Sequence, residues 1–167
     1  MQTFLPYPSA AHSARVLDDA RLRKQGQEAA QIVRTLLGLT AGYQHHPAVT
    51  MWRGAEGALG WYTSEIGREC RRRGFAASFD TEVFGLLYRA GFMVARQPWW
   101  MGDRQFHLAH QSALVRKLPR RYGPHFPFAP TQMPYLWPTD KGTFRLSKPD
   151  IQRIKEGELV AWPTREP

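Results

Sequence analysis

The stretch SARVLDDARLRKQGQEAAQIVRTLLG, residues 13–38, decides the fold class of this chain. Its apolar positions recur every three or four residues, which predicts an amphipathic helix over residues 11–38. The apolar stripe of this helix consists of Leu22, Ala29, Val33, Leu36 and Leu37. A second, mainly polar row lies beside it within about 80° around the helix, and consists of Asp18, Arg21, Gln25, Glu28 and Ile32. Because this polar row borders the expected core, it is either a half-buried set of ion pairs or the floor of a functional site.

Length and composition predict a single cytoplasmic domain, residues 1–167. A chain of this length can bury roughly two-thirds of the surface that its unfolded form exposes. The single cysteine, Cys70, excludes an internal disulfide and a thiolate zinc cage, and the start MQTFLPYP lacks the features of a signal peptide. No apolar run approaches the roughly 20 residues that cross a bilayer, so we expect no membrane partner.

The charge of the chain points to a polyanionic partner. It contains 23 Lys and Arg against 14 Asp and Glu, a net charge of +9 with a pI near 10.2. Guanidinium groups match the geometry of phosphates, so nucleic acid is the leading partner class, ahead of acidic protein or anionic membrane.

Periodicity and helix end signals predict an all-α fold, a compact three-helix domain with irregular connections. The three helices span residues 11–38, 47–74 and 104–118. Weaker patterns predict short helices at residues 80–91 and 147–158. The stretch PRRYGPHFPFAPTQMPYLWP, from Pro119, is too rich in proline for a regular helix, and we expect an extended Pro- and aromatic-rich C-terminal segment. Residues 1–122 would form the helical core and residues 123–167 an extension.

The second predicted helix contains glycines that each cost roughly 1 kcal/mol relative to alanine. Such a cost suggests that another helix or a connecting segment packs closely against them. These glycines are Gly54, Gly57, Gly60 and Gly67, while Gly38 and Gly74 stand where the first and second helices should end.

Two basic segments are candidate phosphate contacts. RECRRRGF, residues 68–75, is either a solvated helix end whose cations suit the helix dipole or a phosphate-contacting edge. KLPRRYGPHF, residues 117–126, mixes cations that could hold phosphates with a ring, Tyr122, that could stack on a base or sugar.

The histidines leave two interpretations open. His107 and His110 lie three residues apart on the third predicted helix, and His46 precedes Pro47. They are either ordinary hydrogen-bonding side chains or members of a site. No HExxH motif and no cysteine pair accompanies them, and no phosphate-binding glycine motif follows a strand, so we expect no metal and no other cofactor.

Three segments occur in the order GYQHHPAV (42–49), RECRRRGF (68–75) and HQSALVRKLPRRYG (110–123). They resemble a Gly-Tyr-x-x-His-Pro link, a Glu-Cys-x-x-Arg-Gly-Phe helix end and a Leu-x-x-Lys…Pro…Tyr segment of the small phage-type pyrimidine dimer DNA glycosylases, also called endonuclease V of that type, and their bacterial relatives. The resemblance covers roughly Met1 to Tyr122. It implies a compact all-α domain that binds duplex DNA and bends out a nucleotide.

The resemblance also implies a mechanism. In this family the chain's own α-amino group attacks the sugar C1′ and releases the base, and the resulting imine leads to strand scission by β-elimination. A terminal amine suits this chemistry because its ordinary pKa of about 7.7 to 8 leaves a neutral fraction at neutral pH. Since Gln2 is large, the initiator should be retained, and the amine would belong to Met1.

The chain departs from the family at the catalytic glutamate. When the sequences are aligned through AAQIV, the family's Arg-Glu pair falls on Lys24 and Gln25, so that an amide replaces the glutamate. Glu28 or Asp18, one turn away on the same face, would then supply the carboxylate.

The sequence therefore predicts a DNA glycosylase, with abasic-site lyase activity through the N-terminal amine, that acts on a damaged or modified base. The alternatives are a non-catalytic DNA-binding module of the same fold, or an enzyme that modifies a base or glycosidic bond with His107, His110 and Glu28. Duplex DNA is the expected partner, and no obligate protein partner is inferred. The candidate catalytic residues are Met1, Asp18, Gln25, Glu28, His46, His107 and His110. The candidate DNA contacts are Arg21, Lys24, Arg71, Arg72, Arg73, Lys117, Arg120, Arg121 and Tyr122.

Overall fold

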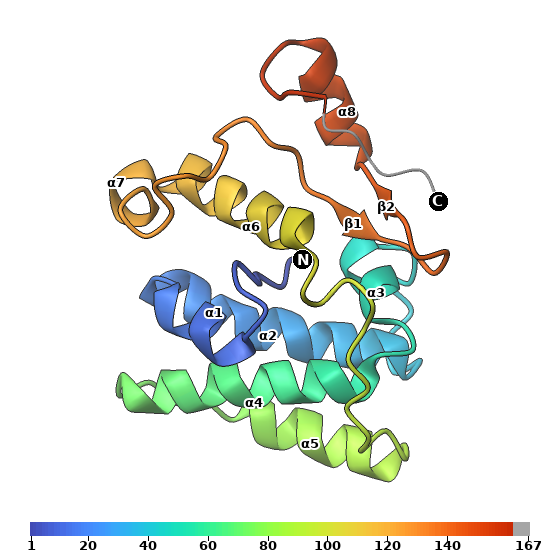
Figure 1. The fold of residues 1–167 in the computed structure, drawn as a ribbon. Coiled ribbons are helices and arrows are strands. Elements are labelled where there is room, and N and C mark those ends of the chain that lie inside the picture. Colours follow the sequence, from blue (N-terminus) through green and yellow to red (C-terminus); the bar gives the residue numbers. More distant parts are fainter. Residues whose placement is uncertain (162–167) are drawn as a thin grey trace. The chain divides into compact units, whose positions relative to one another are not determined.

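The structure, a computed structural model, describes residues 1–161 and divides into two compact units, Met1–Pro98 and Trp99–Pro167. Both units are mainly helical (Figure 1), so the all-α prediction is confirmed. No helix among the described residues is long and apolar enough to cross a membrane. The first unit contains α1 (Ala10–Val16), α2 (Asp19–Leu36), α3 (Pro47–Trp52), α4 (Glu56–Arg72) and α5 (Phe79–Arg89). The second contains α6 (Arg104–Lys117), α7 (Pro119–Tyr122), β1 (Trp137–Pro138), β2 (Phe144–Arg145) and α8 (Lys148–Lys155).

Each of the two long predicted helices is broken once. Between α1 and α2 the backbone of Leu17 is extended (φ −64°, ψ 141°), and the Asp18 carboxylate caps the new helix by accepting a hydrogen bond from the Arg21 N–H at 3.0 Å. Between α3 and α4, Gly54 adopts a left-handed conformation (φ 80°) that ends the shorter helix. Gly38 and Gly74 also have positive φ and end α2 and α4, as predicted.

In the first unit, α4 packs against α1, α2 and α5, and side-chain-free positions allow the approach of α5 (Figure 1). A Cβ atom on Gly60 would collide with Leu87, and one on Gly67 would collide with Asp80. A Cβ on Gly57 would meet the backbone of the segment that follows α5. The predicted close packing is therefore confirmed at these three glycines, whereas Gly54 has open space around it and serves as a helix end.

The second unit is built on α6, which begins at the predicted cap Asp103. Its hydrophobic cluster contains Ala109 of α6 and Met133 and Leu136 of the following chain. That chain is irregular, as predicted, apart from a two-stranded antiparallel hairpin in which Trp137 pairs with Arg145 and Pro138 with Phe144. The short helix predicted at residues 147–158 is α8, capped by Ser147. The single-domain prediction and its boundary at residue 122 stay predictions.

Candidate active site

The first residues of the chain lie against the polar row of α2. The backbone N–H of Gln2 donates a hydrogen bond to Glu28 Oε2 at 2.8 Å, and the backbone N–H of Phe4 donates to Gln25 Oε1. Since the α-amino nitrogen is separated from the Gln2 nitrogen by two backbone atoms, covalent geometry keeps it within about 7 Å of the Glu28 carboxylate. The row that was predicted to be the floor of a site therefore holds the N-terminus of the chain.

Gln25 is the buried anchor of this arrangement, with an exposed fraction of 1 %. Its Oε1 also accepts a hydrogen bond from the Tyr62 hydroxyl at 2.8 Å, and the same hydroxyl lies 3.3 Å from the carbonyl oxygen of Phe4. Burial, followed by the charge of Glu28, raises the pKa of Tyr62 well above its ordinary value, so this hydroxyl stays protonated. Sequence reasoning missed Tyr62, and the only available signal was a polar group at an inward position of its helix.

Glu28 occupies the accessible edge of the row. Its side chain is mostly buried, and Lys24 Nζ lies 3.8 Å from Glu28 Oε1. Lys24 is itself well exposed, which makes this a weak pair that a polyanion can compete for. The carboxylate therefore combines contact with the N-terminal segment and an opening toward solvent on the Lys24 side.

His46 belongs to the same region. Its Nδ1 accepts the backbone N–H of Ala48 at 3.1 Å and so caps α3, which places the proton of the neutral ring on Nε2. Burial and the charge of the N-terminal ammonium lower the pKa of His46, which shows that the ring is close enough to the chain's terminus to sense it. The Trp52 indole N–H donates to the Thr3 hydroxyl at 2.9 Å and ties the terminal segment to α3 as well.

Asp18 and Arg21 form the structural end of the row. Asp18 caps α2 and lies 2.7 Å from the Arg21 guanidinium, and both side chains are largely buried. This is the ion-pair interpretation of the polar row, and it applies to these two residues, whereas Gln25 and Glu28 contact the N-terminal segment.

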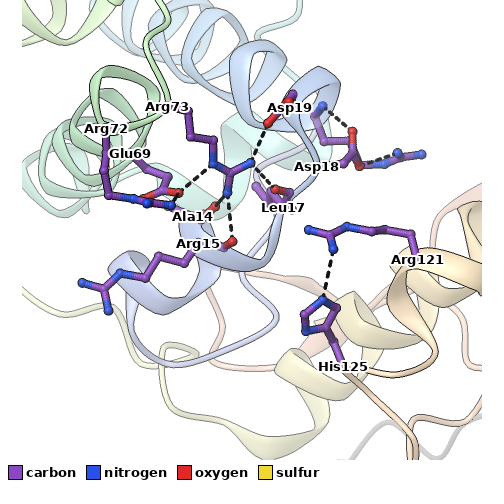
Figure 2. Close-up of polar contacts among 11 residues, drawn as sticks. Ala14, Arg15, Leu17, Asp18, Asp19, Glu69, Arg72, Arg73, Arg121 and His125 are labelled. Carbon is purple, nitrogen blue, oxygen red and sulfur yellow. Dashed lines mark hydrogen bonds and ion pairs between the residues drawn. The ribbon is translucent and has the colours of Figure 1, made fainter.

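Arg73 is an internal residue, contrary to its predicted role as a DNA contact (Figure 2). Its guanidinium donates to backbone carbonyls at the end of α1 and to two carboxylates, and its side chain is 15 % exposed. The acceptors are the carbonyls of Ala14, Arg15 and Leu17 and the side chains of Asp19 and Glu69. Arg73 thus joins α1, α2 and α4 and has no donor geometry to spare for a phosphate.

Arg71 and Arg72 remain on the surface. Arg71 pairs with Asp80 at 2.7 Å and Arg72 with Glu69 at 2.6 Å, and both guanidinium groups are more than half exposed. The hydrogen bond from Arg72, with a further one from Arg73, lowers the pKa of Glu69 although burial opposes the shift. Exposed ion pairs of this kind can exchange a carboxylate for a phosphate, so these two residues stay predicted DNA contacts.

In the second unit, Lys117, Arg120 and Arg121 are exposed, and Arg121 Nη1 lies 3.4 Å from His125 Nε2 (Figure 2). Tyr122 corrects the prediction that it stacks on DNA, because its side chain is 0 % exposed and its ring stacks on Phe126 at a centroid distance of 6.3 Å. A tyrosine among cations has the same local sequence whether it packs inward or outward.

His107 and His110 are buried on α6. His107 Nε2 accepts the Gly102 N–H at 3.0 Å, and the His110 ring lies 4.4 Å from the ring of Phe106. Burial, with the charge of His107, lowers the pKa of His110 to about 3. These are features of packed histidines, and a joint site with Glu28 stays a prediction. Within residues 1–161 no group of three His, Cys, Asp or Glu side chains could hold a metal ion.

A helical unit that holds its own N-terminus beside a carboxylate, with exposed arginines nearby, has the features expected of a DNA repair glycosylase. Residues 1–83 match the family model described as pyrimidine dimer DNA glycosylase, and in this part the chain belongs to that family. The resemblance predicted from the sequence is thereby confirmed for the link at residues 42–49 and the helix end at residues 68–75, while the third motif lies beyond the match. No curated protein and no solved structure matched the chain.

Proposed function

We propose that the protein is a DNA glycosylase in which the α-amino group of Met1 is the nucleophile and Glu28 is the assisting carboxylate. The observation that carries the proposal is the hydrogen bond from the Gln2 N–H to Glu28 Oε2 at 2.8 Å. It supports an amine and a carboxylate close to one sugar, and the family assignment supports DNA as the substrate.

The proposed reaction begins with the neutral amine attacking C1′ of a damaged nucleotide in duplex DNA. The C1′–N bond breaks, the base leaves with the bonding electrons, and the amine proton is transferred away. Glu28 is placed to accept that proton and to stabilise the positive charge that develops on the sugar and on the imine. Loss of a C2′ proton and cleavage of the C3′–O bond then complete the abasic-site lyase step.

Gln25 has a different part in this proposal. Its Oε1 is occupied by the Phe4 N–H and the Tyr62 hydroxyl, so it positions the terminal segment and does not replace a carboxylate. Glu28, one turn later on α2, takes the role that the sequence comparison left without a residue. His46 caps α3 as a neutral ring near the amine, and its lowered pKa avoids a second positive charge there at neutral pH.

Binding of duplex DNA would use cations that the fold leaves on its surface. In the first unit these are Lys24, Arg71 and Arg72. In the second unit they are Lys117, Arg120 and Arg121. Each would neutralise a phosphate and release counterions, so that affinity should fall steeply with salt concentration.

The test is to trap the imine. The full chain is incubated with duplexes that carry a pyrimidine dimer, an abasic site or a modified pyrimidine, and borohydride is added to reduce any imine to a stable covalent bond. We expect base release from one damaged duplex and trapping on abasic DNA. Glu28→Gln should abolish both, whereas Glu82→Gln, which removes another carboxylate of the same unit, should not.

A glycine added before Met1 should prevent trapping while DNA binding persists. Equal trapping by that variant would assign the nucleophile to a lysine, and Lys24→Arg would identify it. DNA binding without base release or trapping on any of the three duplexes would refute the enzyme proposal and favour the non-catalytic binding module.

A further inference from the structure

An apolar patch lies on the surface of α4, α5 and the segment that follows α5. Its side chains have exposed fractions between 40 % and 74 %. They are Trp61, Phe84, Tyr88, Phe92, Met93 and Val94. Single exposed hydrophobic residues are ordinary, but six large ones gathered in one region of a soluble unit mark an interaction surface.

The turn after α5 creates this patch. Gly91 adopts φ 79°, and hydrogen bonds from the N–H groups of Gly91 and Phe92 return to carbonyls in the last turn of the helix. The chain then passes back over α4 until Val94 reaches the bare backbone at Gly57. Every residue from 89 to 97 is exposed, although this segment includes the apolar run Gly-Phe-Met-Val-Ala. The segment is held against α4 without burying its own side chains.

A groove of about 230 Å³ runs through the patch. Gly57 and Gly60 remove side chains from its floor, Leu87 adds an apolar surface, and the lining includes the rings of Trp61 and Phe84. The volume is below the roughly 300 to 1,000 Å³ of small-molecule sites, and suits one or two anchoring side chains of a peptide. Among the lining residues, only Ser64 offers a polar side chain.

The charges beside the groove are positive. Arg89 follows Tyr88, and Arg96 follows Ala95, which lines the groove. Both arginines are exposed, and neither forms any of the ion pairs found within residues 1–161. No acidic residue lines the groove. An occupant should therefore carry negative charge next to its apolar anchors.

We propose that this groove docks an acidic peptide segment of a partner protein, with aromatic or aliphatic anchors in the groove and Asp or Glu side chains against Arg89 and Arg96. Bases of single-stranded DNA fit less well, because their polar edges would face an almost wholly apolar lining without hydrogen-bond partners. A second copy of this chain would bring another net charge of +9 against the same arginines. Most of the patch follows residue 83, where the family match ends.

The experiment selects random dodecapeptides displayed on phage against the immobilised full chain, and measures synthetic versions of the winners by fluorescence anisotropy. We expect the selected peptides to be rich in Asp and Glu around aromatic or aliphatic residues. The double variant Trp61→Ser, Phe84→Ser should weaken their binding by about tenfold or more. Leu39→Ser, which removes an equally exposed apolar side chain outside the patch, should not.

The charge is tested separately. Arg89→Glu with Arg96→Glu should also weaken peptide binding by about tenfold and reduce its salt dependence, while Lys141→Glu in the second unit should change neither. Selected peptides without acidic residues, or equal binding by the patch variant, would overturn the proposal. It would also be overturned if the patch variant instead lost binding to oligo(dT), or lost a concentration-dependent dimer in light scattering.

Discussion

Replacement of Arg73 by alanine should destabilise the first unit strongly, because one guanidinium serves five acceptors. Three are carbonyls at the end of α1, and two are carboxylates, of which Glu69 is 5 % exposed. Hydrogen bonds that involve a charged group contribute about 1.5 to 3 kcal/mol each and are not additive. Removal of one partner from a buried ion pair costs roughly 3 to 5 kcal/mol. Because Arg72 keeps its bonds to Glu69, we expect a loss of about 3 to 4 kcal/mol in the free energy of unfolding.

The assay is urea unfolding followed by far-ultraviolet circular dichroism and tryptophan fluorescence. With a urea dependence of about 1 to 3 kcal/mol per molar for small proteins, the midpoint should fall by about 1 to 3 M. Arg72→Ala is the matched control, since it removes the neighbouring, exposed partner of the same Glu69 and should change the midpoint little. Arg73→Lys should be intermediate, because lysine keeps the charge without the planar fork. Equal midpoints for Arg73→Ala and Arg72→Ala would refute the structural role of Arg73.

Three further outcomes are expected. Gly67→Ala should cost about 1 to 3 kcal/mol, because its methyl group would collide with Asp80 of α5, whereas Gly42→Ala, which meets nothing, should cost far less; thermal unfolding compares the two, and equal costs would contradict the close packing. The pKa of His110 falls from 6.5 to about 3 on folding, so the folded state favours the neutral ring. Its contribution, on the order of 4 to 5 kcal/mol, is complete above pH 6.5 and is lost as the pH falls from there toward 3, and urea midpoints that do not fall between pH 7 and pH 4 would contradict it. Tyr122→Ala should destabilise the protein by about 3 to 5 kcal/mol while the folded fraction keeps its affinity for DNA, and a loss of affinity without loss of stability would restore the stacking role.

Local signals predicted the helix ends well. Glycine with positive φ ends α2 and α4, and Asp103 and Ser147 cap the helices that they precede, because these preferences are decided by a residue and its nearest neighbours. The break at Leu17 was not predictable, since an amphipathic pattern continues through it. The carbonyls left by that break are satisfied by Arg73, 56 residues later in the sequence, and no local pattern contains that partner.

The candidate site was predictable in outline. Periodicity placed Gln25 and Glu28 at the edge of the core, where both lie in the structure. It could not say which of them meets the substrate, because that depends on where the first four residues of the chain pass. Once Phe4 and Tyr62 occupy the Gln25 oxygen, Glu28 is the remaining acid on that part of the row.

The N-terminal segment is held at alternate residues. The N–H groups of Gln2 and Phe4 reach side chains three positions apart on α2, Glu28 and Gln25, so the segment and the helix run in opposite directions. A slip of one residue would offer the N–H of Thr3 instead and would break its bond to Trp52, which makes the register of the segment a property of its backbone. The side chain of residue 1 takes part in neither bond. The place of the first nitrogen is therefore independent of which amino acid carries it, and a family that shares this register can change its first residue without moving its nucleophile.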